Sequence, residues 1–183
     1  MKEILPSIQQ RRSAMAFSPE PIPQDHLLQI FRAASFAPSA YNEQPWQFIV
    51  ANRNNTEAFN GVLNTLAPAN QEWARNAGAL VVSAARENYT KVVGPNYYAL
   101  HDLGMATALF LLQAQAMGYV THMMGGFDHY EIRKVLKFDD TLQIGAVIAL
   151  GKPGKVENLS LKNKQRELSP RMRMELENVI RIL

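Results

Sequence analysis

Two nearly continuous apolar runs constrain the fold of this chain more than any other feature of its sequence. Residues 79–85 read Ala-Leu-Val-Val-Ser-Ala-Ala, and residues 144–150 read Ile-Gly-Ala-Val-Ile-Ala-Leu. A strand with one solvated face alternates apolar and polar residues, whereas a strand buried on both faces reads as a continuous apolar run. We therefore expect these two segments to lie inside one sheet, with helices covering both of its faces.

Three helices can be placed in the first part of the chain from periodicity and stop signals. The first is expected over residues 2–10 and the third over residues 57–66. The second begins at Pro23 or Gln24 and ends before Pro38. The second must stop there because a proline disfavours helical backbone in the residue that precedes it. The apolar residues expected to turn inward are Ile4, Leu5 and Ile8 in the first helix and Leu27, Ile30, Phe31 and Ala34 in the second.

Two further helices are expected in the second half of the chain. Residues 97–117 are apolar almost all round, which predicts a central buried helix that ends near Gly118. Asp128 stands three residues before Glu131, which is the spacing of a capping box that opens a helix. The residues expected on the buried side of this last helix are Ile132, Val135 and Leu136.

Helices and strands therefore intermingle along the chain. A third strand is expected at residues 47–51, but strands and helices do not alternate strictly, and loops that contain proline interrupt the pattern. This arrangement favours an α+β sandwich over a doubly wound parallel sheet. The 183 residues contain no internal repeat and no linker, so we expect one domain over residues 1–183.

Composition limits the chemistry. The chain has no cysteine, which excludes thiolate nucleophiles, iron–sulfur clusters and CxxC pairs, so redox chemistry would need a bound cofactor. The common dinucleotide, phosphate-loop, hydrolase and HExxH motifs are absent, and the four histidines fit no metal-ligand spacing. The net charge of +3 suits an anionic ligand, but the charges are too scattered for a nucleic-acid-binding module.

The apolar stretches also bear on location. Residues 1–6 show no apolar segment followed by a small-residue cleavage site, which argues against a secretory signal. The most apolar stretch, residues 103–112, has about half the length that would span a bilayer. We therefore expect a cytoplasmic protein without a membrane partner.

The first segment with a chemical signal is Arg11-Arg12-Ser13, where a helix gives way to a loop. Arginine suits bidentate contact with phosphate, and a neighbouring hydroxyl can add a hydrogen bond to the same anion. Taken alone, the segment equally fits a solvated helix C-terminus, where arginine interacts favourably with the helix dipole.

The second segment is the loop of residues 37–46, which contains two prolines, small residues and amides. Small side chains allow the backbone to approach a flat ring, and Asn42 can hydrogen-bond heteroatoms at the edge of such a ring. Tyr41 is a candidate substrate contact in the same loop. Without further context the loop could also be a rigid connector.

Together the two segments resemble the nitroreductase-like family of FMN-dependent oxidoreductases, which carries an Arg-Arg-Ser motif followed by a Pro-Ser-Ser/Ala-x-Asn-x-Gln-Pro-Trp loop. The matching residues are Arg11, Arg12 and Ser13, and then Pro38, Ser39, Ala40, Asn42, Gln44, Pro45 and Trp46. The resemblance implies an α-β-α sandwich with a mainly antiparallel sheet, in an intertwined homodimer. The first motif would bind the phosphate and ribityl chain of FMN, and the second, from the other subunit, would line the isoalloxazine ring.

Two later segments resemble the family near the flavin ring. Asn70 stands where members often place an asparagine at the polar edge of the flavin. Met124, Gly125 and Gly126 resemble the loop whose backbone N–H approaches flavin N5, and glycine permits such a close approach. Without the resemblance, the glycine pair reads as a turn before the capped helix.

Near the end of the chain, Arg171 and Arg173 resemble the C-terminal basic pair that reaches the flavin phosphate in the family. Lys164 and Arg166 have the same spacing and remain a rival pair. A third reading leaves these charges solvated near the terminus.

Two positions depart from the commonest family pattern. Met15 stands where many members have Lys or Arg, and Trp73 stands where some have Lys beside the pyrimidine ring. A cation there would stabilise the reduced, anionic flavin, so its absence bears on the reduction potential and the choice of acceptor. Trp73 is therefore a second candidate substrate contact, and Met15 is kept among the cofactor-binding residues.

The resemblance implies an oxidoreductase that passes hydride from NADH or NADPH through flavin N5 to a small acceptor such as a nitroaromatic, a quinone or an enone. No side chain is named as a catalytic acid or base, because the cofactor carries the chemistry. The alternative from another class is a flavin-binding protein without turnover, used for storage or regulation.

Overall fold

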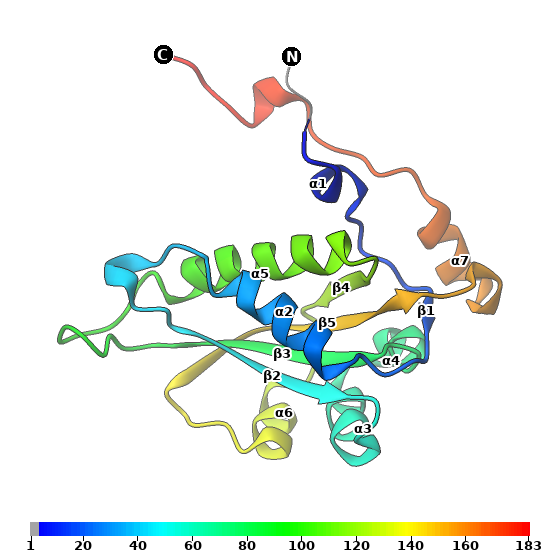
Figure 1. Cartoon of the computed structure of the whole chain (residues 1–183), viewed down its shortest axis with the longest axis horizontal. Helices are drawn as coiled ribbons and strands as arrows, with labels where there is room; N and C mark the ends of the chain where they lie inside the picture. Colours follow the sequence, from blue (N-terminus) through cyan, green and yellow to red (C-terminus); the bar gives the residue numbers. More distant parts are fainter. Residues whose placement is uncertain (1–3) are drawn as a thin grey trace.

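A computed structural model of the chain describes residues 4–183 and contains one antiparallel sheet between two layers of helices (Figure 1). The central strands are β3 (Ala79–Arg86) and β5 (Leu142–Pro153), which pair with each other. The strands that complete the sheet are β2 (Trp46–Asn52) beside β3, and β4 (Val120–Met124) and β1 (Phe17–Ser18) beside β5. The predicted α+β sandwich with an antiparallel sheet is confirmed.

The two apolar runs form the centre of the sheet, as their sequence predicts. Every residue of β3 except Arg86 is buried, and Val82 lies opposite Val147 of β5 and Ile49 of β2. Alternate residues face opposite layers: Leu80 and Val82 belong to one core cluster, and Ala79 and Val81 belong to the other. A strand that is covered on both faces favours apolar side chains throughout, which explains the nearly continuous run; the one polar residue, Ser83, is buried with its hydroxyl bonded to the backbone of Ala146.

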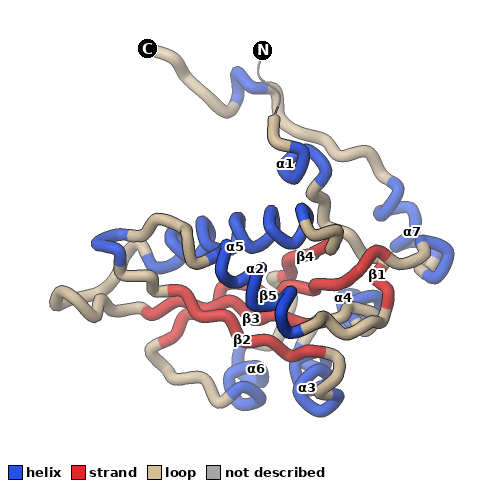
Figure 2. Tube along the Cα trace, in the orientation of Figure 1, coloured by secondary structure: helices blue, strands red, loops and turns tan. Residues whose placement is uncertain are grey.

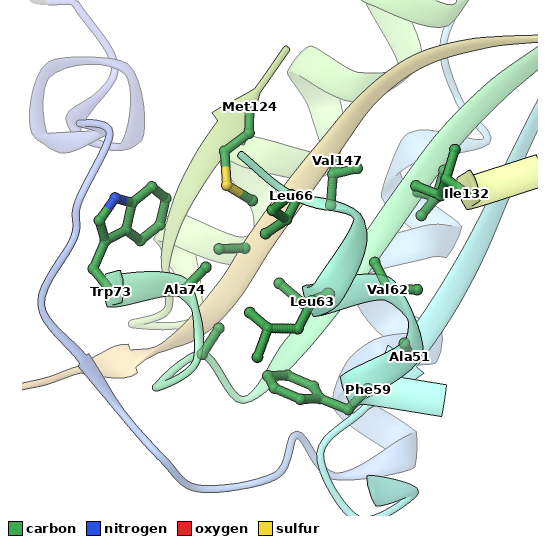
Figure 3. Close-up of a cluster of buried hydrophobic side chains, with 14 of the residues drawn as sticks. Ala51, Phe59, Val62, Leu63, Leu66, Trp73, Ala74, Met124, Ile132 and Val147 are labelled. Atoms are coloured by element: carbon green, nitrogen blue, oxygen red, sulfur yellow. The ribbon is translucent and has the colours of Figure 1, made fainter. Parts of the chain in front are cut away.

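One helical layer consists of α2 (Gln24–Ala34) and the long α5 (Ala99–Ala116), and the other of α3 (Thr56–Thr65), α4 (Pro68–Ala74) and α6 (His129–Leu136) (Figure 2). Figure 3 shows the cluster beneath the second layer, where Leu63 of α3 and Ile132 of α6 pack on Val147 of the sheet. The expected inward face of α2 is confirmed, since Leu27, Ile30 and Ala34 are buried.

Local signals set several helix ends where expected. The Asp128 carboxylate accepts hydrogen bonds from the backbone N–H groups of Tyr130 and Glu131 and so caps α6. Gly118 follows α5 with a φ of +77°, which a residue with a side chain adopts less readily. In α6 only Ile132 is fully buried, and the predicted burial of Val135 is wrong because that residue has a relative exposure of 41%.

The N-terminal helix differs from its prediction. The helix α1 spans only Pro6–Gln10, because a proline fits the first turn of a helix and cannot extend it backwards. Ile4, Leu5 and Ile8 are exposed in the single chain, so the prediction that they turn inward is wrong. Lys2, the predicted first residue, lies outside the described residues.

Several elements carry no strong sequence signal and were not predicted. They are β1, β4, α4, α7 (Leu161–Leu168) and three short 3-10 turns at Ala40–Asn42, Val156–Asn158 and Leu176–Asn178. The strand β4 mixes polar and apolar residues, and only two of its five side chains are buried. The helix α5, predicted to be buried all round, leaves Leu100, Gly104 and Ala108 exposed along one side.

The last segment of the chain is an arm that leaves the body of the molecule. After α7, residues 169–183 run past α1, and the two termini lie at the same side of the molecule (Figure 1). The apolar side chains of the arm that are exposed are Met172, Met174, Leu176, Val179, Ile180, Ile182 and Leu183. This is an unusual density of exposed apolar side chains for a soluble monomer.

Candidate functional site

Five arginines converge on one open cavity of about 430 Å³ between α1, α7 and the start of the arm. We call it the arginine pocket; its charged lining is Arg11, Arg12, Arg166, Arg171 and Arg173, with Ser13 and Ser169 beside them. Because α1 ends at Gln10, residues 11–13 continue as extended backbone into the pocket. The Nη1 atom of Arg171 donates to the carbonyl of Arg11 at 2.8 Å and joins the two chain ends.

The pocket carries a strong positive charge with little compensation. Burial lowers the pKa of the Arg11 guanidinium, and repulsion from Arg171 and Arg173 lowers it further. The nearest carboxylate is the buried Glu167, whose Oε1 lies 3.9 Å from Nη2 of Arg12. Guanidiniums that crowd together in this way favour a multiply charged anion, and a phosphate accepts their forked hydrogen bonds well.

The two rival basic pairs do not exclude each other in space. Arg171 and Arg173 line the pocket from the arm, and Arg166 lines the same pocket from α7. Lys164 is half-buried and is not among the lining residues. Five of the six predicted basic residues in the Arg-Arg-Ser segment and the two pairs therefore line one pocket, and Lys164 does not.

Met15 and Trp73 lie behind the pocket, in the core. The backbone N–H of Met15 donates to Oε2 of Glu167 at 2.7 Å, and its side chain is buried in the cluster beneath α4. Trp73 has a relative exposure of 1% and stacks on Phe17, with ring centroids 6.1 Å apart. A side chain so deeply buried is part of the packing, and its position does not fit the predicted contact with substrate (Figure 3).

His122 of β4 is half-buried and lies against this core, and the sequence assigned its side chain no role. Its ring lies 4.4 Å from that of Trp73, and Nδ1 is 3.0 Å from the carbonyl oxygen of Ala14, so this nitrogen carries the proton. Burial lowers the pKa of His122 and outweighs the opposing effect of that hydrogen bond. Burial and the nearby Arg166 and Arg11 thus both disfavour the charged imidazole.

Asn70 and the glycine pair meet at the edge of the same region. The Asn70 side chain on α4 donates from Nδ2 to the carbonyl of Gly126 at 3.2 Å. A Cβ atom on Gly126 would lie 3.2 Å from that nitrogen, whereas Gly125 faces open space. Both glycines are exposed and follow directly on the buried Met124. Asn70, Gly125 and Gly126, which were predicted to line the flavin ring, therefore lie together at the surface.

The loop of residues 38–45 lies elsewhere. It adjoins the N-terminal end of α5, whereas α1 and the arginine pocket lie toward the C-terminal end of that helix (Figure 1). An α-helix of 18 residues is about 27 Å long at 1.5 Å per residue. None of Pro38, Ser39, Ala40 and Asn42 lines the arginine pocket within one chain, and Tyr41 is 71% exposed at the surface.

Comparison with known proteins identifies the family. The Nitroreductase family profile matches residues 8–152. A protein of Archaeoglobus fulgidus, whose name proposes NADH dehydrogenase or NAD(P)H nitroreductase activity, is 31% identical over 162 residues, which cover 84% of this chain and 87% of the relative. The protein DrgA of a Synechocystis species is 28% identical and covers 81% of this chain and 86% of its own.

Solved structures agree with the sequence comparison. A crystal structure described as an oxidoreductase containing FMN superimposes with a TM-score of 0.90 at 31% identity, over 98% of this chain and 91% of that one. A nitroreductase family protein from Clostridium novyi gives a TM-score of 0.72 at 26% identity, over 87% and 89% of the two chains. The chain belongs to the nitroreductase family of oxidoreductases.

Among residues 4–183, no helix is long and apolar enough to cross a membrane.

Proposed function

We propose that the protein is an FMN-dependent oxidoreductase that takes electrons from NADH or NADPH and delivers them to a small organic acceptor. The observation that carries the proposal is the arginine pocket, in which five guanidiniums and two serine hydroxyls surround a cavity large enough for a phosphate. This donor set fits the phosphate monoester of FMN. The FMN-containing relative and the NAD(P)H-named relative support the same cofactors.

The residues that would hold FMN fall into two groups. Arg11, Arg12, Ser13, Arg171 and Arg173 would bind the phosphate, with Arg166 beside them. Asn70, Met124, Gly125 and Gly126 would border the flavin ring on the same subunit, with Met15 behind them in the core. When bound, FMN supplies the hydride chemistry, and the protein supplies binding, orientation and electrostatic tuning.

The second half of the site would come from a partner subunit in a homodimer. The loop with Pro38, Ser39, Ala40 and Asn42 contacts the N-terminal turn of α5 and does not line the arginine pocket of its own chain. The exposed apolar side chains of the arm, of α1 and of one side of α5 provide a surface that a second copy could cover. Two such contacts in a symmetric pair would complete two identical sites.

The residues near the proposed ring position set no single acid or base for the reaction. His122 uses Nδ1 to hold the Ala14 carbonyl, so it fixes the segment that follows the arginines. Tyr41 would approach the acceptor from the partner loop, because it is the exposed aromatic residue of that loop. A nitroaromatic, a quinone or an enone fits a site with an aromatic wall.

Anaerobic reduction tests this proposal. Apoprotein is titrated with FMN under flavin fluorescence, and the complex is then mixed with NADH and NADPH in turn, followed by a panel of acceptors. The expected result is stoichiometric FMN uptake, bleaching of the flavin absorbance by at least one nucleotide, and reoxidation by an organic acceptor. Uptake without bleaching would favour a storage or regulatory flavoprotein, and failure to take up FMN would overturn both functions.

A further inference from the structure

The turn between α2 and β2 has a conformation that its own residues do not favour. Tyr41, Asn42 and Gln44 have φ angles of 54°, 51° and 51°, in the left-handed region. Side chains rarely adopt this region, and a cluster of such residues persists only where the surroundings impose it. The question is which contacts impose it here.

The first contact fixes the beginning of the turn. The backbone N–H of Ala40 donates to Oδ2 of Asp102 at 3.0 Å. Asp102 lies in the first turn of α5, and its side chain is 2% exposed. Its second oxygen, Oδ1, lies 3.4 Å from Nδ1 of His101. A buried carboxylate that accepts a backbone N–H is a strong and directional anchor.

The second contact fixes the end of the turn. The side chain of Glu43 is 4% exposed, and its Oε1 accepts hydrogen bonds from the backbone N–H of Thr90, at 2.8 Å, and from the Thr90 hydroxyl. The neighbouring Lys91 donates from Nζ to the carbonyl of Asn42. The turn is thus held at one end by the buried Asp102 of α5 and at the other by Thr90, which donates to the turn's own buried Glu43.

The conformation of the turn also orients the Asn42 side chain. The amide of Gln44 donates from Nε2 to Oδ1 of Asn42 at 3.1 Å. This bond uses the carbonyl end of the Asn42 amide, and its NH2 group makes no hydrogen bond within the described part of the chain. Asn42 is exposed. The clamped turn therefore presents a fixed hydrogen-bond donor to the surface that a partner subunit would meet.

We propose that Asp102 and Thr90 with Glu43 are positioning residues of the flavin site, which hold the strained turn so that Asn42 presents its NH2 group to the FMN of the partner subunit. This inference rests on the proposed function. Neither carboxylate touches the flavin itself. Their role is to keep the donor in place before FMN arrives, so that binding does not have to order the turn.

The test compares variants that break each contact with variants that keep it. Asp102→Ala removes the acceptor for Ala40, and Asp102→Asn keeps an acceptor oxygen at the same position. Thr90→Val removes the hydroxyl donor to Glu43, and Thr90→Ser keeps it. The control is Asp140→Ala, at an exposed carboxylate in the turn before β5. The measurements on each purified dimer are the FMN dissociation constant, the visible spectrum and midpoint potential of bound FMN, and the melting temperature of the apoprotein.

Asp102→Ala is expected to weaken FMN binding about tenfold and to shift the flavin spectrum and potential, and Thr90→Val is expected to weaken it about threefold. Asp102→Asn, Thr90→Ser and the control should stay within about twofold of wild type. A lower melting temperature with unchanged FMN affinity, spectrum and potential would show a merely structural role and overturn the inference.

Two further outcomes are decided in advance. If Asp102→Ala does not fold, the Thr90 pair decides: equal FMN affinity and spectra in Thr90→Val and Thr90→Ser overturn the inference. If wild-type apoprotein takes up no FMN, the proposed function fails and the flavin-positioning role falls with it. Normal uptake by wild type with normal uptake by Asp102→Ala overturns the positioning role alone.

Discussion

The arginine pocket and the turn at residues 38–45 differ in how the chain builds them. The pocket joins segments about 160 positions apart, is open, and is held by few contacts, of which the bond from Arg171 to the Arg11 carbonyl is the most direct. The turn is one short segment in a strained conformation, held by Asp102 of α5 and by the contact of Thr90 with the turn's own Glu43. We infer that charge in the pocket provides affinity, whereas rigidity in the turn provides orientation.

Removing the end of the arm should separate the arginine pocket of one subunit from the turn of its partner, and we expect the largest loss of FMN affinity from this change. A chain that ends at Met174 keeps every arginine of the pocket but loses the exposed apolar residues Leu176, Val179, Ile180, Ile182 and Leu183. We expect it to be monomeric in light scattering and to bind FMN about 100-fold more weakly, because the partner turn is lost. A dimer with wild-type FMN affinity would show that the arm does not join the subunits.

Weakening the pocket alone should have the next largest effect. Arg171→Gln removes a charge-assisted contact to the phosphate and also the bond to the Arg11 carbonyl. We expect FMN affinity to fall about 10-fold to 30-fold in fluorescence titration, with a smaller salt dependence. Arg32→Gln changes the same charge at an exposed position of α2 outside the pocket and serves as the control. Equal effects of the two substitutions would mean that net charge alone attracts the cofactor.

Changing the surface of the turn should alter acceptor selection and leave cofactor binding intact. Tyr41→Ala removes an exposed aromatic ring without touching the clamping carboxylates. The KM for an aromatic quinone should rise about threefold to tenfold, and the FMN dissociation constant should not change. Tyr130→Ala, at an exposed tyrosine of α6, is the control. A KM that stays at the wild-type value would place the acceptor elsewhere.

The smallest effect concerns His122 behind the pocket. Because burial lowers its pKa in the folded state, the unfolded chain binds more protons, and the apoprotein should lose stability as the pH falls below the ordinary histidine pKa of 6.5. Glu43 has a lowered pKa too, through the Thr90 hydroxyl, but its contribution is lost only as the pH falls below about 4.5. Between these two pH limits, the melting temperature should therefore change less with pH for His122→Gln than for wild type. Identical slopes of melting temperature against pH would contradict this assignment.

The sequence predicts the sheet far better than the ends of the chain. The continuous apolar sequence of residues 79–85 and 144–150 predicts strands covered on both faces, and so predicts their place in the centre of the sheet. The pattern of Ile4, Leu5 and Ile8 suggested an inward face, but the single chain offers these side chains no cover. Apolar periodicity shows that a face will be covered, and it does not show whether the same chain or a second copy covers it.

The candidate site divides in the same way. The residue types of the Arg-Arg-Ser segment and of the loop with Asn42 indicated binding to an anion and to a flat ring, because each side chain carries its chemistry with it. The convergence of Arg166 with Arg171, the burial of Trp73, and the bonds from Asp102 and Thr90 to the turn depend on long-range packing. No local pattern encodes them, so they became visible only in the fold.

The central claim is that the arginine pocket binds the phosphate of a flavin. The most direct test is a pair of fluorescence titrations of the apoprotein, one with FMN and one with riboflavin, which lacks the phosphate. Several charge-assisted hydrogen bonds are at stake, so FMN should bind at least about 100-fold more tightly than riboflavin. Arg171→Gln should narrow that difference by weakening FMN alone. Equal affinity of the wild-type apoprotein for the two flavins would contradict the account.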